Sequence, residues 1–199
     1  MNLPNKITLT RIFMIPVFVA IFFLDGIIPF GFGIAAIVFA LAACTDFIYG
    51  HIARSRGLVT NLGKFLDPIA DKVLVSTAMM LILTMQGTLF AKFPQCAQAI
   101  YIATAVCICV IMARELIISA FRQIAATRGL VMAADKLGKY KTTFQDVSIF
   151  ALIFSASISG QAGVIIAAIG FVLFAVATIL TVWSGISYVV KNKQVLKDQ

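Results

Sequence analysis

Residues 162–190 read AGVIIAAIGFVLFAVATILTVWSGISYVV, a run that contains no charged side chain. A helix rises ~1.5 Å per residue and the hydrocarbon core of a bilayer is about 30 Å thick, so ~20 apolar residues can cross it. This run exceeds that length. It therefore predicts a helix that spans a membrane.

Five earlier segments have the same apolar character: 9–24, 31–49, 70–90, 97–121 and 144–159. Gly160 leaves only a very short turn before 162–190, which predicts a helical hairpin. No composition shift separates a soluble domain from the rest. We therefore expect an all-α polytopic membrane protein with about six transmembrane helices, forming a single domain over residues 1–199.

The overall composition agrees with lipid as the main solvent of this chain. Of its 199 residues, 61% are hydrophobic and 12% are charged, whereas about a quarter of a soluble domain is charged. Residues 1–6 lead directly into the first apolar segment without a small-residue cleavage site, so we expect no cleavable signal. The four cysteines lie in or beside apolar segments with no CxxC pair, which indicates packing residues.

Positive charge is concentrated on one side of the predicted spans. Only Asp25 and Lys92 carry charge in the loops of the other side. The basic residues of the first side are Lys6, Arg11, Arg54, Arg56, Lys64, Lys72, Arg122, Arg128, Lys136, Lys139, Lys141, Lys191, Lys193 and Lys197. Because Lys and Arg collect in cytoplasmic loops, both termini are expected in the cytoplasm. The same bias explains the net charge of +8, so we expect no nucleic-acid partner.

Three of the eight acidic residues, Asp46, Asp67 and Asp71, fall at this cytoplasmic edge. The spacing of Asp67 and Asp71 places both carboxylates on one side of a helix. Ionised groups at a membrane edge are costly unless they are paired or bind metal, and ligand sets of oxygen alone suit Mg²⁺ or Mn²⁺. The alternative is that the three aspartates cap helices or pair with Arg54 and Lys72.

The residues between these aspartates favour a phosphorylated ligand. Gly50, Ala53 and Gly63 are small and permit close approach to the backbone, while the Arg54 guanidinium suits phosphate oxygens. The residues alone thus predict a membrane enzyme that acts on a phosphorylated substrate.

Two stretches, DFIYGHIAR at 46–54 and GKFLDPIAD at 63–71, resemble the signature of the CDP-alcohol phosphotransferase family, D-x2-D-G-x2-A-R followed by G-x3-D-x3-D. Residues 4–11, 113–116 and 136–142 are similar to the bacterial phosphatidylglycerophosphate synthase branch. The resemblance implies six spanning helices, a homodimer in the bacterial cell membrane, and phosphatidyl transfer from CDP-diacylglycerol to sn-glycerol 3-phosphate with release of CMP.

The resemblance also implies roles for individual residues. Asp46 and Asp67 would bridge two Mg²⁺ or Mn²⁺ ions, while Asp71 would help to hold the second ion and act as the general base. The residues expected to contact the CDP-lipid are Asn5, Thr8, Gly50, Arg54 and Thr60. His51, the only histidine, is expected at a helix end without a part in proton transfer.

The chain departs from the family pattern at two positions. Tyr49 stands where the signature has its second aspartate, and Asp135 stands where the branch more often has serine. A neutral phenol is a poor ligand for a hard cation, so one of the two expected metal ions should be held less tightly. A catalytically weakened or inactive relative is therefore an alternative reading.

The expected acceptor follows from the cations of the fourth segment and the loop after it. Arg114 interrupts an apolar stretch together with Glu115, and Arg122 lies about two helical turns further on the same face. The residues expected to bind the acceptor phosphate are Arg114, Arg122, Lys139 and Lys141. Such a pocket disfavours cationic acceptors such as choline. Inositol phosphate or phosphatidylglycerol remain alternative acceptors, and a small transporter, with polar residues near the midplane, is an alternative class.

Overall fold

The computed structural model describes residues 3–55, 61–127 and 136–193. Within these ranges it leaves out the side chains of residues 3–8, 46–55, 61–65, 67, 126–127, 136–137 and 139. The described residues form helices α1 (Leu3–Phe23), α2 (Gly31–Ser55), α3 (Asn61–Thr84), α4 (Ala97–Thr127), α5 (Lys136–Ala156) and α6 (Gly160–Lys191), with one 3-10 turn, η1 (Phe90–Lys92). They contain no strand, so the predicted all-α class is confirmed.

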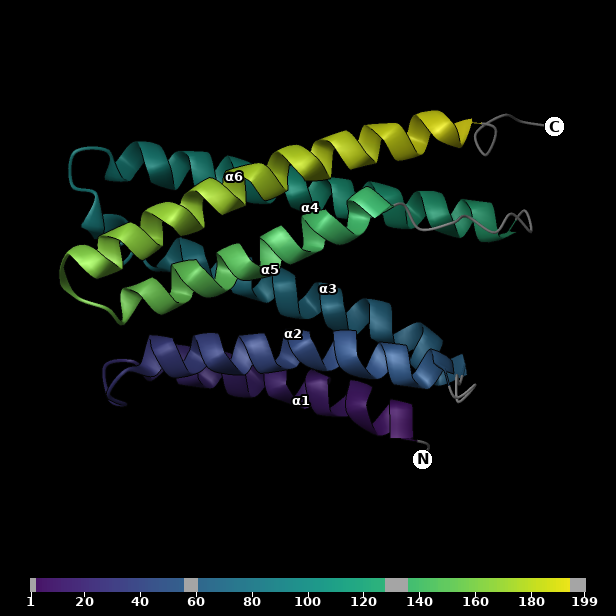
Figure 1. Ribbon diagram of the computed structural model, residues 1–199, viewed down its shortest axis with the longest axis horizontal. Helices are drawn as coiled ribbons and strands as arrows, with labels where there is room; N and C mark the ends of the chain where they lie inside the picture. The colour runs from purple at the N-terminus through teal and green to yellow at the C-terminus, as the bar shows by residue number, and fades with distance from the viewer. Residues whose placement is uncertain (1–2, 56–60, 128–135, 194–199) are drawn as a thin grey trace.

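The six helices run up and down along one common direction (Figure 1). α1 packs on α2, α2 packs on α5, α5 packs on α6, and α6 packs on α4. α3 contacts α1, α2, α4 and α5 and so occupies the middle of the bundle. The start of α3, the end of α4, the start of α5 and the end of α6 all lie at the same end of the molecule, the right-hand end in Figure 1.

The core consists of large apolar side chains that every helix contributes. The Phe18 and Phe39 rings, from α1 and α2, lie 5.9 Å apart at their centres. The largest fully buried side chains are Phe18, Phe39, Phe90, Phe174, Leu74, Ile82, Leu89, Ile108, Ile111, Ile149, Leu152 and Ile153. This packing holds the helices in fixed positions and so fixes the residues at their ends.

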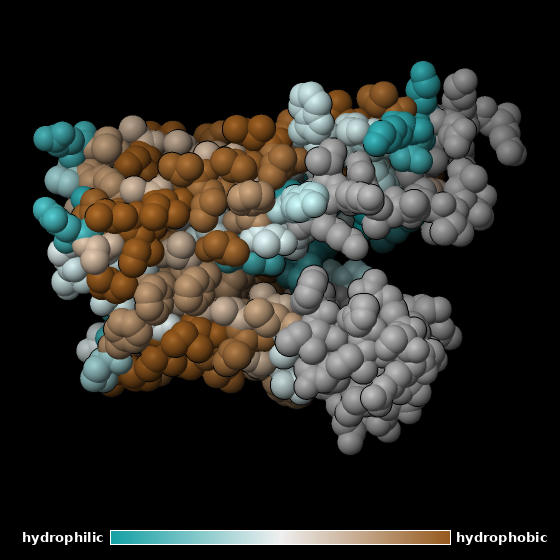
Figure 2. Space-filling view, viewed as in Figure 1, coloured by the Kyte–Doolittle hydropathy of each residue, from teal (hydrophilic) through white to brown (hydrophobic). Residues whose placement is uncertain are grey.

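The exterior of the bundle is also apolar. Leu116, Ile179 and Trp183 are 67%, 66% and 68% exposed, and hydrophobic side chains cover most of the visible face in Figure 2. Among the described residues, two helices are long and apolar enough to cross a membrane: Ala97–Ala125 and Gly160–Lys191, with mean hydropathies of 2.1 and 2.8. Such an exterior suits lipid, because large apolar patches are rare on monomeric soluble proteins.

The predicted hairpin between the last two helices is confirmed. α5 ends at Ala156 and α6 begins at Gly160, whose φ of +73° favours glycine. The Lys92 ammonium donates a hydrogen bond of 2.7 Å to the Ile158 carbonyl within this turn. The hairpin therefore fixes α5 and α6 to each other at the end opposite the start of α5.

Several helix ends differ from the predicted segments. The third helix ends at Thr84 instead of residue 90, and turns with η1 follow it. Two other helices are longer than predicted: α4 continues to Thr127 instead of ending at residue 121, and α5 begins at Lys136 instead of residue 144. The prediction relied on apolar stretches, whereas helical backbone hydrogen bonds also continue through polar residues at a membrane edge. As a result, polar residues around 122 and 141 lie on regular helix.

Candidate active site

A cavity of about 320 Å³ lies between four helices, toward the end of the bundle where α5 begins. Figure 2 shows hydrophilic side chains within a recess toward this end. The polar and charged residues that line the cavity are Asp71, Lys72, Arg114, Glu115, Ser119, Arg122, Lys141, Thr142, Ser184 and Tyr188. Four residues predicted for the site, Asp71, Arg114, Arg122 and Lys141, thus border one space.

Asp71 is a partly buried residue of α3, and it borders this cavity as well as a second, adjoining one. Asp67 lies one helical turn earlier on α3, and Asp46 lies on α2, which contacts α3. The side chains of Asp46 and Asp67 are not described. The described residues contain no group of three potential metal-ligating side chains, so the predicted metal cluster stays a prediction.

The residues predicted to bind the CDP-lipid belong to parts of the chain whose side chains are not described. Asn5 and Thr8 lie on α1, and Gly50 and Arg54 lie on α2, near the helix ends on the cavity side of the molecule. Thr60 and Asp135 lie outside the described residues, and the side chains of Tyr49, His51 and Lys139 are not described either. Their roles stay predictions.

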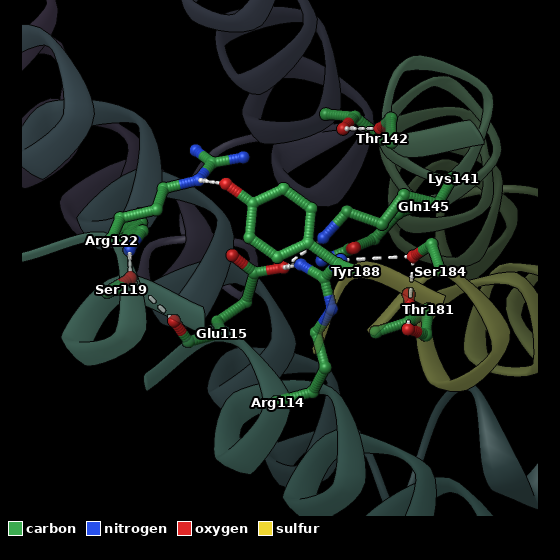
Figure 3. Close-up of polar contacts among 12 residues, drawn as sticks. Arg114, Glu115, Ser119, Arg122, Lys141, Thr142, Gln145, Thr181, Ser184 and Tyr188 are labelled. Atoms are coloured by element: carbon green, nitrogen blue, oxygen red, sulfur yellow. Dashed lines mark hydrogen bonds and ion pairs between the residues drawn. The ribbon is translucent and has the colours of Figure 1, made fainter. Parts of the chain in front are cut away.

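Glu115 joins two of the predicted phosphate-binding cations (Figure 3). Its Oε1 accepts a hydrogen bond of 3.0 Å from Arg114 Nη1, and the same oxygen accepts one from Lys141 Nζ. Arg114 Nη2 donates to Ser184 Oγ at 3.0 Å. The sequence identified Glu115 only as an interruption of an apolar stretch. The structure makes it the carboxylate that orients Arg114 and Lys141.

Arg122 is held by an aromatic residue of α6. Its Nε donates to the Tyr188 hydroxyl at 3.2 Å, and its guanidinium carbon lies 5.3 Å from the centre of the Tyr188 ring. The Tyr188 side chain is buried and packs edge-on against Phe121. Guanidinium groups interact favourably with aromatic rings at such distances. These contacts therefore hold the Arg122 side chain in one position at the cavity.

A third contact ties α3 to α4 at the cavity wall. Lys72 Nζ donates to Ser119 Oγ, and Ser119 Oγ in turn donates to the Glu115 backbone carbonyl at 2.6 Å. These two hydrogen bonds place the Lys72 ammonium beside α4, the helix that carries Arg114 and Arg122. Lys72, like Ser119, was not among the residues predicted for the site.

The cavity has a surplus of positive charge. Four cations line it, Lys72, Arg114, Arg122 and Lys141, against the two carboxylates of Asp71 and Glu115. Lys141 lies just before the predicted span that begins at residue 144. Burial lowers the pKa of its ammonium, and the nearby Glu115 carboxylate partly offsets this lowering. A surplus of this kind attracts an anion such as a phosphate group.

α6 contributes Ser184, Gly185 and Tyr188, which the sequence analysis missed. A Cβ atom on Gly185 would lie 2.9 Å from Arg114 Cγ and 3.1 Å from its Nε, so the absence of a side chain makes room for the arginine. Ser184 and Tyr188 lie four residues apart, which places them on one face. In the sequence, these small and polar residues stand out within the otherwise apolar segment 162–190. Their partners lie on another helix, which the sequence did not indicate.

Fold and cavity together define a class: an all-α protein with an exterior suited to lipid and a cation-rich cavity toward one end. Comparison with known families makes the class specific. The model of the CDP-alcohol phosphatidyltransferase family matches residues 1–183, and the chain belongs to this family. The resemblance inferred from the two aspartate-containing stretches is thereby confirmed.

Three bacterial relatives bear the name CDP-diacylglycerol–glycerol-3-phosphate 3-phosphatidyltransferase. The protein from Bacillus subtilis (strain 168) is 39% identical over 162 residues, which cover 76% of each chain. Those from Salmonella typhimurium and Escherichia coli (strain K12) are 35% and 36% identical over 202 and 201 residues. These two alignments span 100% of this chain and 98% of each relative.

Proposed function

We propose that this protein transfers a phosphatidyl group from CDP-diacylglycerol to sn-glycerol 3-phosphate, giving phosphatidylglycerophosphate and CMP. The observation that carries the proposal is the cavity in which Asp71 meets the cations of α4 and α5. The names of relatives that align with the whole chain support the same reaction.

The charge of the cavity favours an acceptor with its own phosphate. Arg122, Arg114 and Lys141 attract the phosphate of sn-glycerol 3-phosphate, and Lys139 on the same helix as Lys141 adds to the attraction. A cationic acceptor such as choline is repelled by the same surplus. With the phosphate on the cations, the hydroxyl at the other end of this short molecule is directed to Asp71.

Asp71 acts as the general base in the proposed reaction. Its carboxylate accepts the proton of the acceptor hydroxyl while that oxygen attacks the β-phosphorus of CDP-diacylglycerol. A new phosphorus–oxygen bond forms, the bond from the β-phosphorus to the CMP oxygen breaks, and CMP leaves. The cations fix the acceptor beside the carboxylate, which lowers the entropic part of the barrier. The CDP part is bound by Asn5, Thr8, Gly50, Arg54 and Thr60.

The metal ions of this proposal are Mg²⁺ or Mn²⁺, held by Asp46, Asp67 and Asp71. Carboxylate oxygens are the donors that such cations prefer, and α3 carries Asp67 and Asp71 one turn apart on one side. When bound there, such ions would supply neutralisation of the charge that develops on the phosphate oxygens. Tyr49 has a neutral phenol where the family signature has a carboxylate, so one of the two ions would be held less tightly.

The proposed setting is the bacterial cell membrane, crossed by six helices, with both termini and the cavity on the cytoplasmic side. The Lys and Arg bias of the loops supports this orientation, since the cavity lies at the end of the bundle that carries most basic residues. The protein works as a homodimer by analogy with its family.

The deciding experiment is a CMP-release assay on purified protein with CDP-diacylglycerol and a titration of Mg²⁺ or Mn²⁺. Release of CMP that requires sn-glycerol 3-phosphate is the expected result. Release that instead requires inositol phosphate or phosphatidylglycerol would overturn the choice of acceptor. The second candidate function is binding of CDP-lipid without turnover, and Tyr49 in place of a family aspartate favours it. Acceptor-independent binding with no CMP release at any metal concentration would establish this function.

A further inference from the structure

A second cavity, of about 200 Å³, adjoins the first and extends between α3, α4 and α5. It shares five residues with the first cavity: Asp71, Lys72, Glu115, Lys141 and Thr142. Its remaining walls are mainly apolar: Val73, Val75, Met79, Met112 and Leu116. The space beside the proposed general base thus continues into apolar surroundings.

One buried amide interrupts these apolar walls. Gln145 is 5% exposed, lies on α5 one turn after Lys141 and lines the same cavity as Glu115; Figure 3 labels it among the residues of the site. Its Nε2 donates to the Met79 sulfur at 3.6 Å. Among the described residues, this is the only hydrogen bond of the amide group. A thioether is a weak acceptor, whereas a primary amide offers two donor hydrogens and a carbonyl oxygen.

The other uncharged polar side chains of this cavity have ordinary partners. The Ser76 hydroxyl donates to the Val73 carbonyl at 3.2 Å, and the Thr142 hydroxyl donates to the Gly138 carbonyl at 2.9 Å. Buried polar groups are nearly always hydrogen-bonded, and a partner missing from the protein is commonly supplied by a ligand or water. Gln145 is therefore the lining residue with the most unused capacity to bind a neutral polar group.

We propose that Gln145 determines acceptor specificity by hydrogen-bonding the hydroxyl of the acceptor that does not react. The proposal rests on the proposed function. With the phosphate on the cations and the reacting hydroxyl at Asp71, a three-carbon polyol phosphate has one hydroxyl left. A hydroxyl both donates and accepts, and so does the Gln145 amide, whereas the charged residues are occupied with each other or with phosphate.

The test compares two acceptors that differ only in this hydroxyl: sn-glycerol 3-phosphate and 3-hydroxypropyl phosphate. Both carry a phosphate and a primary hydroxyl. The wild type should favour sn-glycerol 3-phosphate about tenfold in kcat/KM of CMP release, the effect of one neutral hydrogen bond. In Gln145→Leu the preference should fall to within about threefold, because activity on 3-hydroxypropyl phosphate stays while activity on sn-glycerol 3-phosphate drops.

Two further variants make the test robust. Gln145→Met, whose side chain is unbranched like that of glutamine, should show the same change of preference. This variant distinguishes the loss of the amide from a packing defect caused by the branched leucine. Ser148→Ala, on the same helix and hydrogen-bonded to the Gln145 backbone carbonyl, should keep the wild-type preference.

The proposal is overturned if the wild type does not distinguish the acceptors. It is also overturned if both Gln145 variants keep the preference, or if both lose activity equally on the two acceptors. Absence of turnover with sn-glycerol 3-phosphate in the wild type would instead contradict the proposed function.

Discussion

At the residue scale, the cavity depends on a single glutamate, because Glu115 is the carboxylate that Arg114 and Lys141 share. Without it, the buried Lys141 and the partly buried Arg114 would face each other with no opposite charge between them. Removing one partner of a buried ion pair is more damaging than replacing the whole group, since the remaining charge stays desolvated. Glu115 therefore stabilises the site while leaving it positively charged overall.

We expect Glu115→Gln to lower the melting temperature of the purified protein by about 5 °C, since the substitution keeps the shape and removes only the charge. Lys141→Met in the same chain should restore part of this loss, because it removes one of the two cations left unpaired. Differential scanning fluorimetry of the two single variants and the double variant measures the coupling. Strictly additive losses would show that the pair contributes nothing to stability.

Tyr49 sets a second expectation at this scale. Tyr49→Asp supplies the carboxylate of the family pattern and should raise CMP release at low Mg²⁺ or Mn²⁺ by about tenfold or more, while changing little at saturating metal. The matched control is Asp71→Asn, which keeps the size of the side chain and should abolish release at every metal concentration. Equal metal titrations of the wild type and Tyr49→Asp would show that the phenol does not weaken metal binding.

At the scale of elements, α6 fixes both arginines of α4. Ser184 binds the Arg114 guanidinium, Gly185 leaves room for its stem, and Tyr188 holds Arg122. These three residues occupy the last two turns of α6, where α4 and α6 are in contact. An apolar helix thereby positions charged groups that it does not itself carry.

This arrangement predicts that Gly185→Ala raises the KM for sn-glycerol 3-phosphate by about tenfold, because the added Cβ displaces Arg114. Gly170→Ala is the control: it lies on the same helix, and its Cβ would come equally close, 2.9 Å, to a Leu152 methyl group far from the cavity. Both variants should lose some stability, but only Gly185→Ala should change KM. The same KM in both variants would mean that Arg114 does not contact the acceptor phosphate.

The sequence predicted the helices and the cations but not their partners. The long apolar stretches were enough to identify six helical segments, and the position of Gly160 indicated the hairpin. Arg114 was expected to face phosphate directly, whereas the structure engages it with Glu115 and Ser184. Such pairings depend on which helices pack side by side, and the apolar pattern of a chain with apolar surfaces on all sides does not specify that choice.

At the scale of the whole molecule, charge and hydropathy divide the bundle along its length. The middle carries apolar side chains outside as well as inside, and most basic residues fall in the sequence segments near one end. The opposite end carries short turns, in which Lys92 binds the Ile158 carbonyl and Asp25 Oδ1 accepts a hydrogen bond of 2.8 Å from the Phe32 amide. The two ends thus differ in kind, as expected of a protein with a fixed orientation in a membrane.

This orientation predicts a labelling pattern. A chain whose only cysteine is the exposed Cys96 should react with a membrane-impermeant maleimide in spheroplasts. A cysteine-free chain with Asn192→Cys should react only after permeabilisation, because that position lies at the end proposed to face the cytoplasm. Reversed accessibility of the two positions, measured by gel shift, would invert the proposed orientation.

The surplus of cations over carboxylates in the main cavity also affects which other anions bind there. A space lined by four positive and two negative groups attracts small anions. With the acceptor phosphate bound as proposed, we expect inorganic phosphate or sulfate to compete for the same place. The apparent affinity for the acceptor should then weaken as the concentration of these anions rises.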